Sequence, residues 1–210
     1  MPPRARGARA DRAHRRAAIG DRLLVAAERM LADGEPYAAI SVERMSREAQ
    51  LTRTTFYVYF EDKADLLHAW LETIDAEIEA AAGGWWELDA GVDRPALREA
   101  LGRILSTYRS HAHLMTAVYE AALFDRALDI GLREVVRRTA DGLARHIRRG
   151  QDGGWVDPAL PPEETASWLA WMIQRGQQRL RSADEAEFER ELDAHTGILW
   201  CALYAPALRT

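Results

Sequence analysis

Side chains that can contact nucleic acid gather in one short stretch of the sequence. They are Thr52, Arg53, Thr54, Thr55, Tyr57, Tyr59 and Lys63. A guanidinium can donate two hydrogen bonds to O6 and N7 of guanine, and threonine offers base edges both a hydroxyl and a methyl group. Phenol and ammonium groups can reach the phosphate backbone. These residue types at this spacing favour the reading of duplex DNA.

Two short capped helices are predicted to present this stretch. Ser41 is a good N-cap for a helix over residues 41–49. Thr52 can cap a second helix over residues 52–60, after a turn at Gln50-Leu51. The side chains expected on their inner face are Val42, Met45, Ala49, Leu51 and Phe56. This arrangement is a helix-turn-helix, whose second helix enters the major groove. Spacing alone also allows an ordinary pair of short core helices.

The segment Leu-Thr-Arg-Thr-Thr-Phe-Tyr-Val-Tyr-Phe-Glu-Asp-Lys, from Leu51 to Lys63, closely resembles the signature of the TetR family of transcriptional repressors. The preceding residues 40–46 also fit, and the resemblance is specific over residues 20–70. Within the family, the aromatic pair and the tryptophan-rich second half are most similar to the ethionamide-regulator-like branch. The resemblance implies phosphate contacts for Ser41 and Lys63, base contacts for Arg53, Thr54 and Thr55, and backbone contacts for Tyr57 and Tyr59.

One turn residue departs from the family pattern. The family often has glycine or asparagine where this chain has Gln50. If Gln50 takes a left-handed backbone conformation, the cost is roughly 1 kcal/mol. The angle at which the second helix would meet DNA is therefore left open by the sequence.

Apolar residues recur at helical spacing along nearly the whole chain, and strand signals are almost absent. We expect an all-α fold of about nine helices, with an N-terminal three-helix helix-turn-helix domain and a helical ligand-binding and dimerisation domain. The predicted domains are a disordered basic arm over residues 1–14, a DNA-binding domain over 15–62 and a second domain over 63–210. The remaining predicted helices lie near residues 19–31, 62–82, 97–108, 114–123, 128–147, 165–181 and 187–204, with a linker over 83–95 and a loop over 151–162.

Charge is distributed unevenly along the chain. The net charge is −5, yet six arginines and one aspartate lie within residues 1–16. A basic head on an acidic body suits a protein that touches phosphate with one end only, although a solvated tail has the same composition. With no apolar run of about 18 residues, no membrane span is expected. The single cysteine, Cys201, excludes a disulfide framework and is expected in the core of a cytoplasmic protein.

All seven tryptophans lie from Trp70 onward. Tryptophans usually fill cores, but several in one bundle can also line an apolar ligand cavity, which the family resemblance implies for this half. The ligand-binding candidates are Trp70, Leu105, Tyr108, Met115, Tyr119, Trp168, Trp171 and Met172. Tyr108 and Tyr119 would anchor polar groups. Because few charged residues fall on these stripes, we expect a small, uncharged, hydrophobic or aromatic effector.

The family resemblance also implies partners. It predicts a homodimer formed through the last two helices, which would read a palindromic double-stranded DNA operator. Repression relieved by the effector is the family default. The helix from Lys63 to about residue 82 would link the reading head to the sensing half and shift when ligand binds. No cofactor is expected.

An enzyme is the main rival class. His111 and His113 could suggest a metal site, but residues two apart on a helix point to different faces, and no ligand cluster accompanies them. No Gly-x-Ser-x-Gly nucleophile motif and no glycine-rich phosphate loop on a strand is present. The sequence therefore predicts neither catalytic nor metal-binding residues. The alternative that remains is a helical small-molecule-binding or interaction protein without sequence-specific DNA binding.

Overall fold

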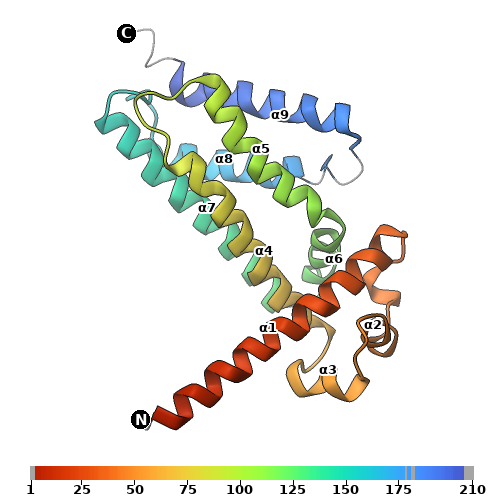
Figure 1. The fold of residues 1–210 in the computed structure, drawn as a ribbon. Helices are drawn as coiled ribbons and strands as arrows, with labels where there is room; N and C mark the ends of the chain where they lie inside the picture. Colours follow the sequence, from red (N-terminus) through yellow and green to blue (C-terminus); the bar gives the residue numbers. More distant parts are fainter. Residues whose placement is uncertain (1–2, 178, 181–182, 206–210) are drawn as a thin grey trace. The chain divides into compact units, whose positions relative to one another are not determined.

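The computed structural model describes residues 3–177, 179–180 and 183–205, and within them the fold is entirely helical (Figure 1). The prediction of an all-α fold with about nine helices is confirmed. The helices are α1 (Pro3–Ala32), α2 (Val42–Glu48), α3 (Arg53–Tyr59), α4 (Lys63–Trp86), α5 (Arg94–Ser110), α6 (Ala112–Ala122), α7 (Arg126–Asp152), α8 (Pro162–Gln177) and α9 (Glu185–Leu199), with a 3₁₀ turn at Tyr37–Ala39 and a π-helical turn at Trp200–Tyr204. None of the described helices is long and apolar enough to cross a membrane.

The chain divides into two compact units. The first unit combines Met1–Ile74 with His113–Gly131, and the second combines Asp75–Ala112 with Leu132–Thr210. The division differs from the predicted boundary at residue 63. The first turns of α4, and α6 from His113 onward, carry buried apolar side chains that belong to the first unit. As a result, α4 begins in the first unit and ends in the second.

The core of the first unit is built on the apolar face of α1. Leu23 and Ala27 are fully buried there, as is Phe56 of α3. Trp70 of α4 is also buried, and its indole Nε1 donates a hydrogen bond to the carbonyl of Gly20 at 3.0 Å. Each large apolar side chain removed from water contributes roughly 1.5–3 kcal/mol, so α1 fixes α2 and α3 mainly by burial.

The start of α1 differs from the predicted basic arm. The structure extends the helix back to Pro3, so the described residues 3–14 are helical. Alanine and arginine are both strong helix formers, which favours this extension. Arg12 adds a contact with the first unit, because its Nη2 donates to the carbonyl of Val58 at 3.3 Å.

The end of α4 also lies beyond the predicted stop at Gly83-Gly84. The helix continues to Trp86, and Trp85 is buried within the second unit. Two glycines in a helix cost about 1 kcal/mol each relative to alanine. Burial of a tryptophan outweighs that cost, so tertiary packing overrides the local signal. α5 begins at Arg94, with Asp93 as N-cap and Pro95 in the first turn, so the connection before it is shorter than the predicted linker over 83–95.

Candidate nucleic-acid interface and ligand cavity

The helix-turn-helix predicted at residues 41–60 is present as α2 and α3. The Ser41 hydroxyl accepts a hydrogen bond from the amide of Arg44 at 3.2 Å, and Thr52 Oγ1 accepts one from the amide of Thr55 at 3.0 Å. Each hydroxyl satisfies one of the amides left unpaired at a helix start. Local sequence therefore sets where both helices begin.

The turn between α2 and α3 has a left-handed residue at Gln50, with φ of 55°. The amide of Gln50 donates to the carbonyl of Arg47 at 3.0 Å, and that of Leu51 to the carbonyl of Ser46 at 2.8 Å. This is the Schellman arrangement that usually places glycine at the left-handed position. The same arrangement ends α1, where Gly34 has φ of 86°. The turn before α3 therefore has glutamine at the left-handed position, whereas the turn after α1 has glycine, which adopts this conformation without steric cost.

The exposed edge of α3 carries Arg53, Thr54 and Tyr57. The Arg53 guanidinium lies 5.6 Å from the centre of the Tyr57 ring, a cation–π distance that holds both side chains on one edge. Val58 is 52% exposed beside them and was not among the predicted contact residues. An exposed valine can meet the methyl group of thymine. This edge can contact bases and phosphates.

Other residues predicted to contact DNA form hydrogen bonds within the protein or are half-buried. Thr52 and Thr55 share a hydrogen bond between their hydroxyls at 2.8 Å, and Thr55 is half-buried. Tyr59 is half-buried too, whereas Ser41 is exposed but used as a cap. These three hydroxyl residues and Tyr59 are therefore less available than Arg53.

The Lys63 ammonium group is surrounded by protein groups and does not face solvent freely. Its Nζ donates to the carbonyls of Tyr37 at 2.5 Å and Ile40 at 2.7 Å, and lies 4.4 Å from the centre of the Tyr37 ring. The Tyr37 hydroxyl returns a hydrogen bond to the carbonyl of Lys63 at 3.1 Å. Burial lowers the pKa of Lys63. The geometry favours a role in fixing the chain before α2 over the phosphate contact implied by the family resemblance.

A partly open cavity lies within the second unit. Its apolar and aromatic lining consists of Ile78, Ala82, Trp85, Trp86, Ile104, Tyr108 and Ile173. Its polar and charged lining consists of Asp75, Glu79, Arg138, Thr139 and Arg145, together with Gly142. Arg138 forms an ion pair with Asp75. The cavity is therefore more charged than the sequence suggested.

Of the predicted ligand residues, Tyr108 lines this cavity. Trp70, Met115 and Tyr119 belong to the first unit, and Leu105 and Met172 lie in the second unit without lining the cavity. Trp168 is 78% exposed and Trp171 51% exposed, so both face away from the core. The residues that the sequence reasoning missed are Trp85 and Trp86, which it had placed in a linker. Two tryptophans next to each other in the sequence were the signal that could have indicated a packed aromatic site there.

An aromatic cluster supports the wall of the cavity. Trp85 and Trp86 stack with ring centres 5.1 Å apart, and Trp85 Nε1 donates to the Tyr204 hydroxyl at 2.9 Å. Tyr204 is in turn hydrogen-bonded to His146 Nε2 at 2.8 Å. Burial lowers the pKa of His146 to about 4, with a smaller contribution from Arg149. The imidazole is therefore neutral at pH 7, and the network holds Trp85 in place.

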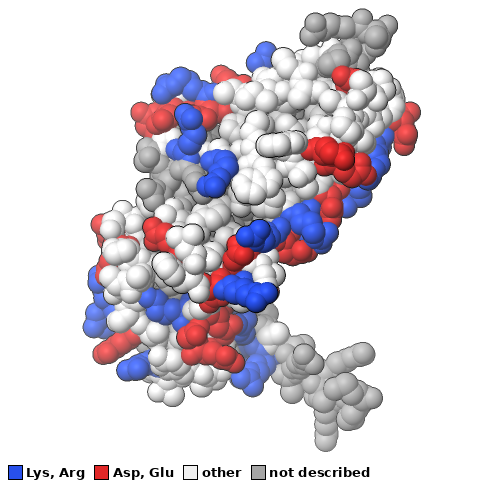
Figure 2. Space-filling view, turned by 180° about the vertical axis from the view of Figure 1, so that it is seen from behind, with Lys and Arg blue, Asp and Glu red and all other residues white. Residues whose placement is uncertain are grey.

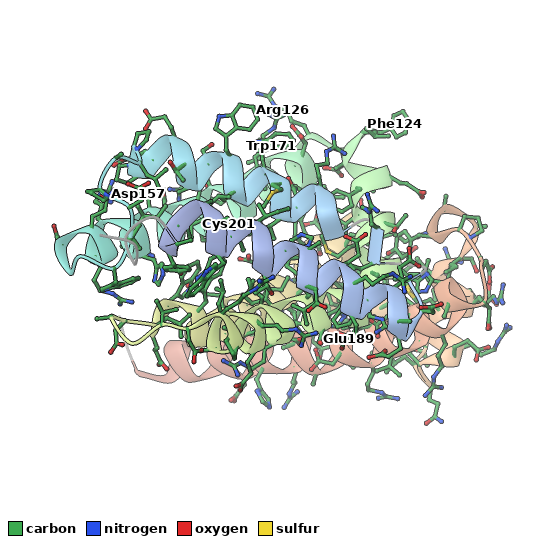
Figure 3. The ribbon with its side chains drawn as sticks, turned by 90° about the horizontal axis from the view of Figure 1, so that it is seen from above. Phe124, Arg126, Asp157, Trp171, Glu189 and Cys201 are labelled. Atoms are coloured by element: carbon green, nitrogen blue, oxygen red, sulfur yellow. The ribbon has the colours of Figure 1, made fainter. Side chains whose placement is uncertain are left out.

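Exposed apolar side chains occur on α8 and α9 of the second unit. They are Trp168, Trp171 and Ile198, and Cys201 is exposed in the turn after α9. Trp171 and Cys201 are labelled in Figure 3. The expectation that Cys201 lies in the core is wrong, because the π-helical turn directs it outward while Leu203 and Tyr204 fill the interior. Figure 2 shows a broad area with few charged side chains in the upper part of that view. Such a face can bury against another protein surface.

The two histidines considered for metal binding do not act together. His111 Nε2 lies 3.0 Å from Glu77 Oε2 in the second unit, whereas His113 is exposed in the first. No group of three metal-ligating side chains occurs in the part of the chain that the structure describes.

Comparisons with known proteins agree with this geometry. The family described as "Bacterial regulatory proteins, tetR family" matches residues 23–70. The HTH-type transcriptional regulator EthR of Mycobacterium tuberculosis is 29% identical over 158 residues, which cover 73% of this chain and 71% of that protein. EthR represents the branch that the aromatic pair indicated.

Solved structures share the fold over most of the chain. A TetR transcription regulator from Haloarcula marismortui has a TM-score of 0.69 at 17% identity, covering 89% of this chain and 98% of that one. A transcriptional regulator from Saccharomonospora viridis, solved in complex with choline, has a TM-score of 0.67 at 17% identity, covering 88% and 97%. Residues 23–70 therefore carry the helix-turn-helix domain of the tetR family of bacterial regulatory proteins, and the chain as a whole shares the fold of solved transcriptional regulators.

Proposed function

We propose that this protein is a ligand-responsive repressor, which binds a palindromic operator as a homodimer and is released from it by a small molecule. The observation that carries the proposal is the exposed edge of α3, where Arg53, Thr54, Tyr57 and Val58 lie together outside the core. An arginine, a hydroxyl and an apolar side chain on one short exposed helix are the groups that read the major groove.

The DNA contacts are tested on sequences selected from a random duplex pool by the wild-type protein. Arg53→Ala should weaken the selected operator by roughly 1–3 kcal/mol and relax its sequence preference. Tyr57→Phe should weaken all duplexes similarly, because a phosphate contact carries no sequence information. Arg29→Ala, on an exposed arginine of α1, is the matched control. Unchanged affinity for every duplex in Arg53→Ala and Tyr57→Phe would contradict DNA reading by α3.

The homodimer is proposed to form through the apolar face of α8 and α9. Sedimentation velocity should show that Trp171→Glu produces monomers, because a charge buried in an apolar interface is unpaired. Phe124→Glu is the control, since Phe124 is 93% exposed but lies in the first unit (Figure 3). If Trp171→Glu leaves the oligomeric state unchanged, another surface forms the dimer.

The cavity of the second unit is the proposed effector site. An effector with an aromatic or hydrophobic body could stack on Trp86 and place a polar group near Arg145 or Glu79. The charged lining broadens the expected effector from an uncharged molecule to an amphiphilic one. A ligand screen by tryptophan fluorescence should lose its hits in Trp86→Leu and keep them in Trp168→Leu, which removes an exposed tryptophan outside the cavity.

Release of DNA is proposed to run through α4, the helix that belongs to both units. Ile78, Ala82 and Trp85 of α4 line the cavity, whereas Leu66 and Trp70 anchor its first half in the first unit. An effector that favours the non-binding state by 1–3 kcal/mol would weaken operator binding about 5–150-fold. A gel shift with and without effector measures this ratio. Effector binding without any change in operator affinity would contradict the coupling.

A further inference from the structure

The turn that precedes α3 is held by an arginine from another helix. Arg22 lies on α1, and its Nη2 donates hydrogen bonds to the carbonyl of Ala49 at 2.7 Å and to that of Gln50 at 3.0 Å. These carbonyls follow the last turn of α2, where a helix leaves acceptors unpaired and carries partial negative charge. One guanidinium thus satisfies both carbonyls of the left-handed turn.

The far end of α3 is held in the same way. Arg16 Nε donates to the carbonyl of Tyr59 at 3.0 Å, and its Nη2 lies 2.5 Å from Asp65 Oδ1. The Arg16 guanidinium also lies 4.7 Å from the centre of the Phe60 ring. Arg12, one turn earlier on α1, donates to the carbonyl of Val58. The arginines of α1 therefore contact the backbone both before and after the exposed edge of α3.

We infer that Arg22 and Arg16 are positioning residues for DNA reading, which set the angle of α3 by clamping the turn before it and its last residue to α1. The inference rests on the proposed function, in which α3 reads DNA. The sequence suggested phosphate contacts for the basic residues 1–16, which include Arg16. The structure instead gives Arg16, like Arg22, carbonyl partners, in charge-assisted hydrogen bonds that are stronger than neutral ones.

A clamp and a phosphate contact differ in measurable ways. A lost phosphate contact weakens all duplexes alike and lowers the salt dependence of binding by about one charge. A lost clamp leaves the number of phosphate contacts unchanged but tilts the reading edge. It therefore weakens the specific complex and leaves non-specific binding and its salt dependence unchanged.

The experiment compares full-length Arg22→Met, Arg16→Met and the matched control Arg29→Met, each confirmed as folded by circular dichroism. Affinity is measured against the selected operator and a scrambled duplex at several salt concentrations. Arg22→Met and Arg16→Met should each bind the operator about tenfold more weakly, with scrambled-duplex affinity and salt slope as in the wild type. Arg22→Lys, which keeps a charged donor, should recover part of the operator affinity. Arg29→Met should bind both duplexes as the wild type does.

An equal loss for both duplexes with a salt slope lowered by about one would overturn the clamp and make Arg22 a phosphate contact. Unchanged operator affinity in both Arg22→Met and Arg16→Met would overturn it as well. Arg53→Ala, measured in parallel, distinguishes failure of the clamp from failure of DNA reading by α3. If Arg53→Ala binds less well while the α1 variants do not, the clamp fails and DNA reading by α3 stands. If Arg53→Ala is also unaffected, the proposed function itself fails.

Discussion

Replacement of Gln50 by glycine should make the protein more stable, although it removes a side chain. Gln50 has φ of 55°, a conformation that costs a residue with a Cβ about 1–2 kcal/mol. Glycine avoids this cost but loses about 0.4–1 kcal/mol through the greater freedom of the unfolded chain. The difference, roughly 0–1.6 kcal/mol, predicts a gain of about 0.8 kcal/mol in the free energy of unfolding at its centre.

Urea denaturation followed by circular dichroism measures this gain. With a slope of about 1–3 kcal/mol per molar urea, the midpoint should rise by a few tenths molar while the slope stays unchanged. Gln50→Ala is the control, because alanine keeps the backbone cost and removes only the exposed side chain. It should not be stabilised. A Gln50→Gly protein that is no more stable than Gln50→Ala would refute the claim that the turn is strained.

Three further outcomes are expected. His146 has a pKa of about 4 in the folded protein against 6.5 in the unfolded chain, so the unfolded state binds the extra proton as the pH falls. The free energy of unfolding should therefore fall by up to about 3 kcal/mol between pH 7 and pH 4. Denaturation of His146→Gln at several pH values should lack this part of the pH dependence. Thr52→Ala should lower the melting temperature by removing a cap worth about 1 kcal/mol, whereas Thr52→Ser should not. Trp70→Phe should cost about 1–3 kcal/mol in urea denaturation, because the bond to the Gly20 carbonyl is lost and the smaller ring leaves space; an unchanged midpoint would show that this bond contributes nothing.

The helix-turn-helix could be predicted because its signals are local. Ser41 and Thr52 cap the helices that follow them within three residues, and the turn residue Gln50 was recognised as a departure from the family pattern. The structure confirms the left-handed conformation that would make this departure costly. Hydrogen bonds between neighbours in sequence need no knowledge of the rest of the fold.

The cavity could not be predicted in the same way. Trp85 and Trp86 follow two glycines, and the local signal for a helix end was overridden by contacts with Tyr204, more than a hundred residues later in the sequence. Helical spacing marked Trp171 as inward-facing, whereas the structure exposes it. Periodicity shows that a helix has an apolar face but does not tell whether that face meets the core, a ligand or another subunit. The partners of Lys63 could not be predicted either, because they are main-chain carbonyl groups, which every residue type carries.

Within α3, Arg12 and Arg16 of α1 donate hydrogen bonds to the main-chain carbonyls of Val58 and Tyr59 and to no exposed side chain of α3. Every residue type supplies the same carbonyl, so the attachment of the helix is independent of the side chains that its outer edge displays. Substitutions at Arg53, Thr54 or Tyr57 can therefore accumulate without weakening the hydrogen bonds that attach α3 to α1. A paralogue could acquire a different target sequence by exchanging these few positions, and a designer could vary them in a library while leaving α1 untouched.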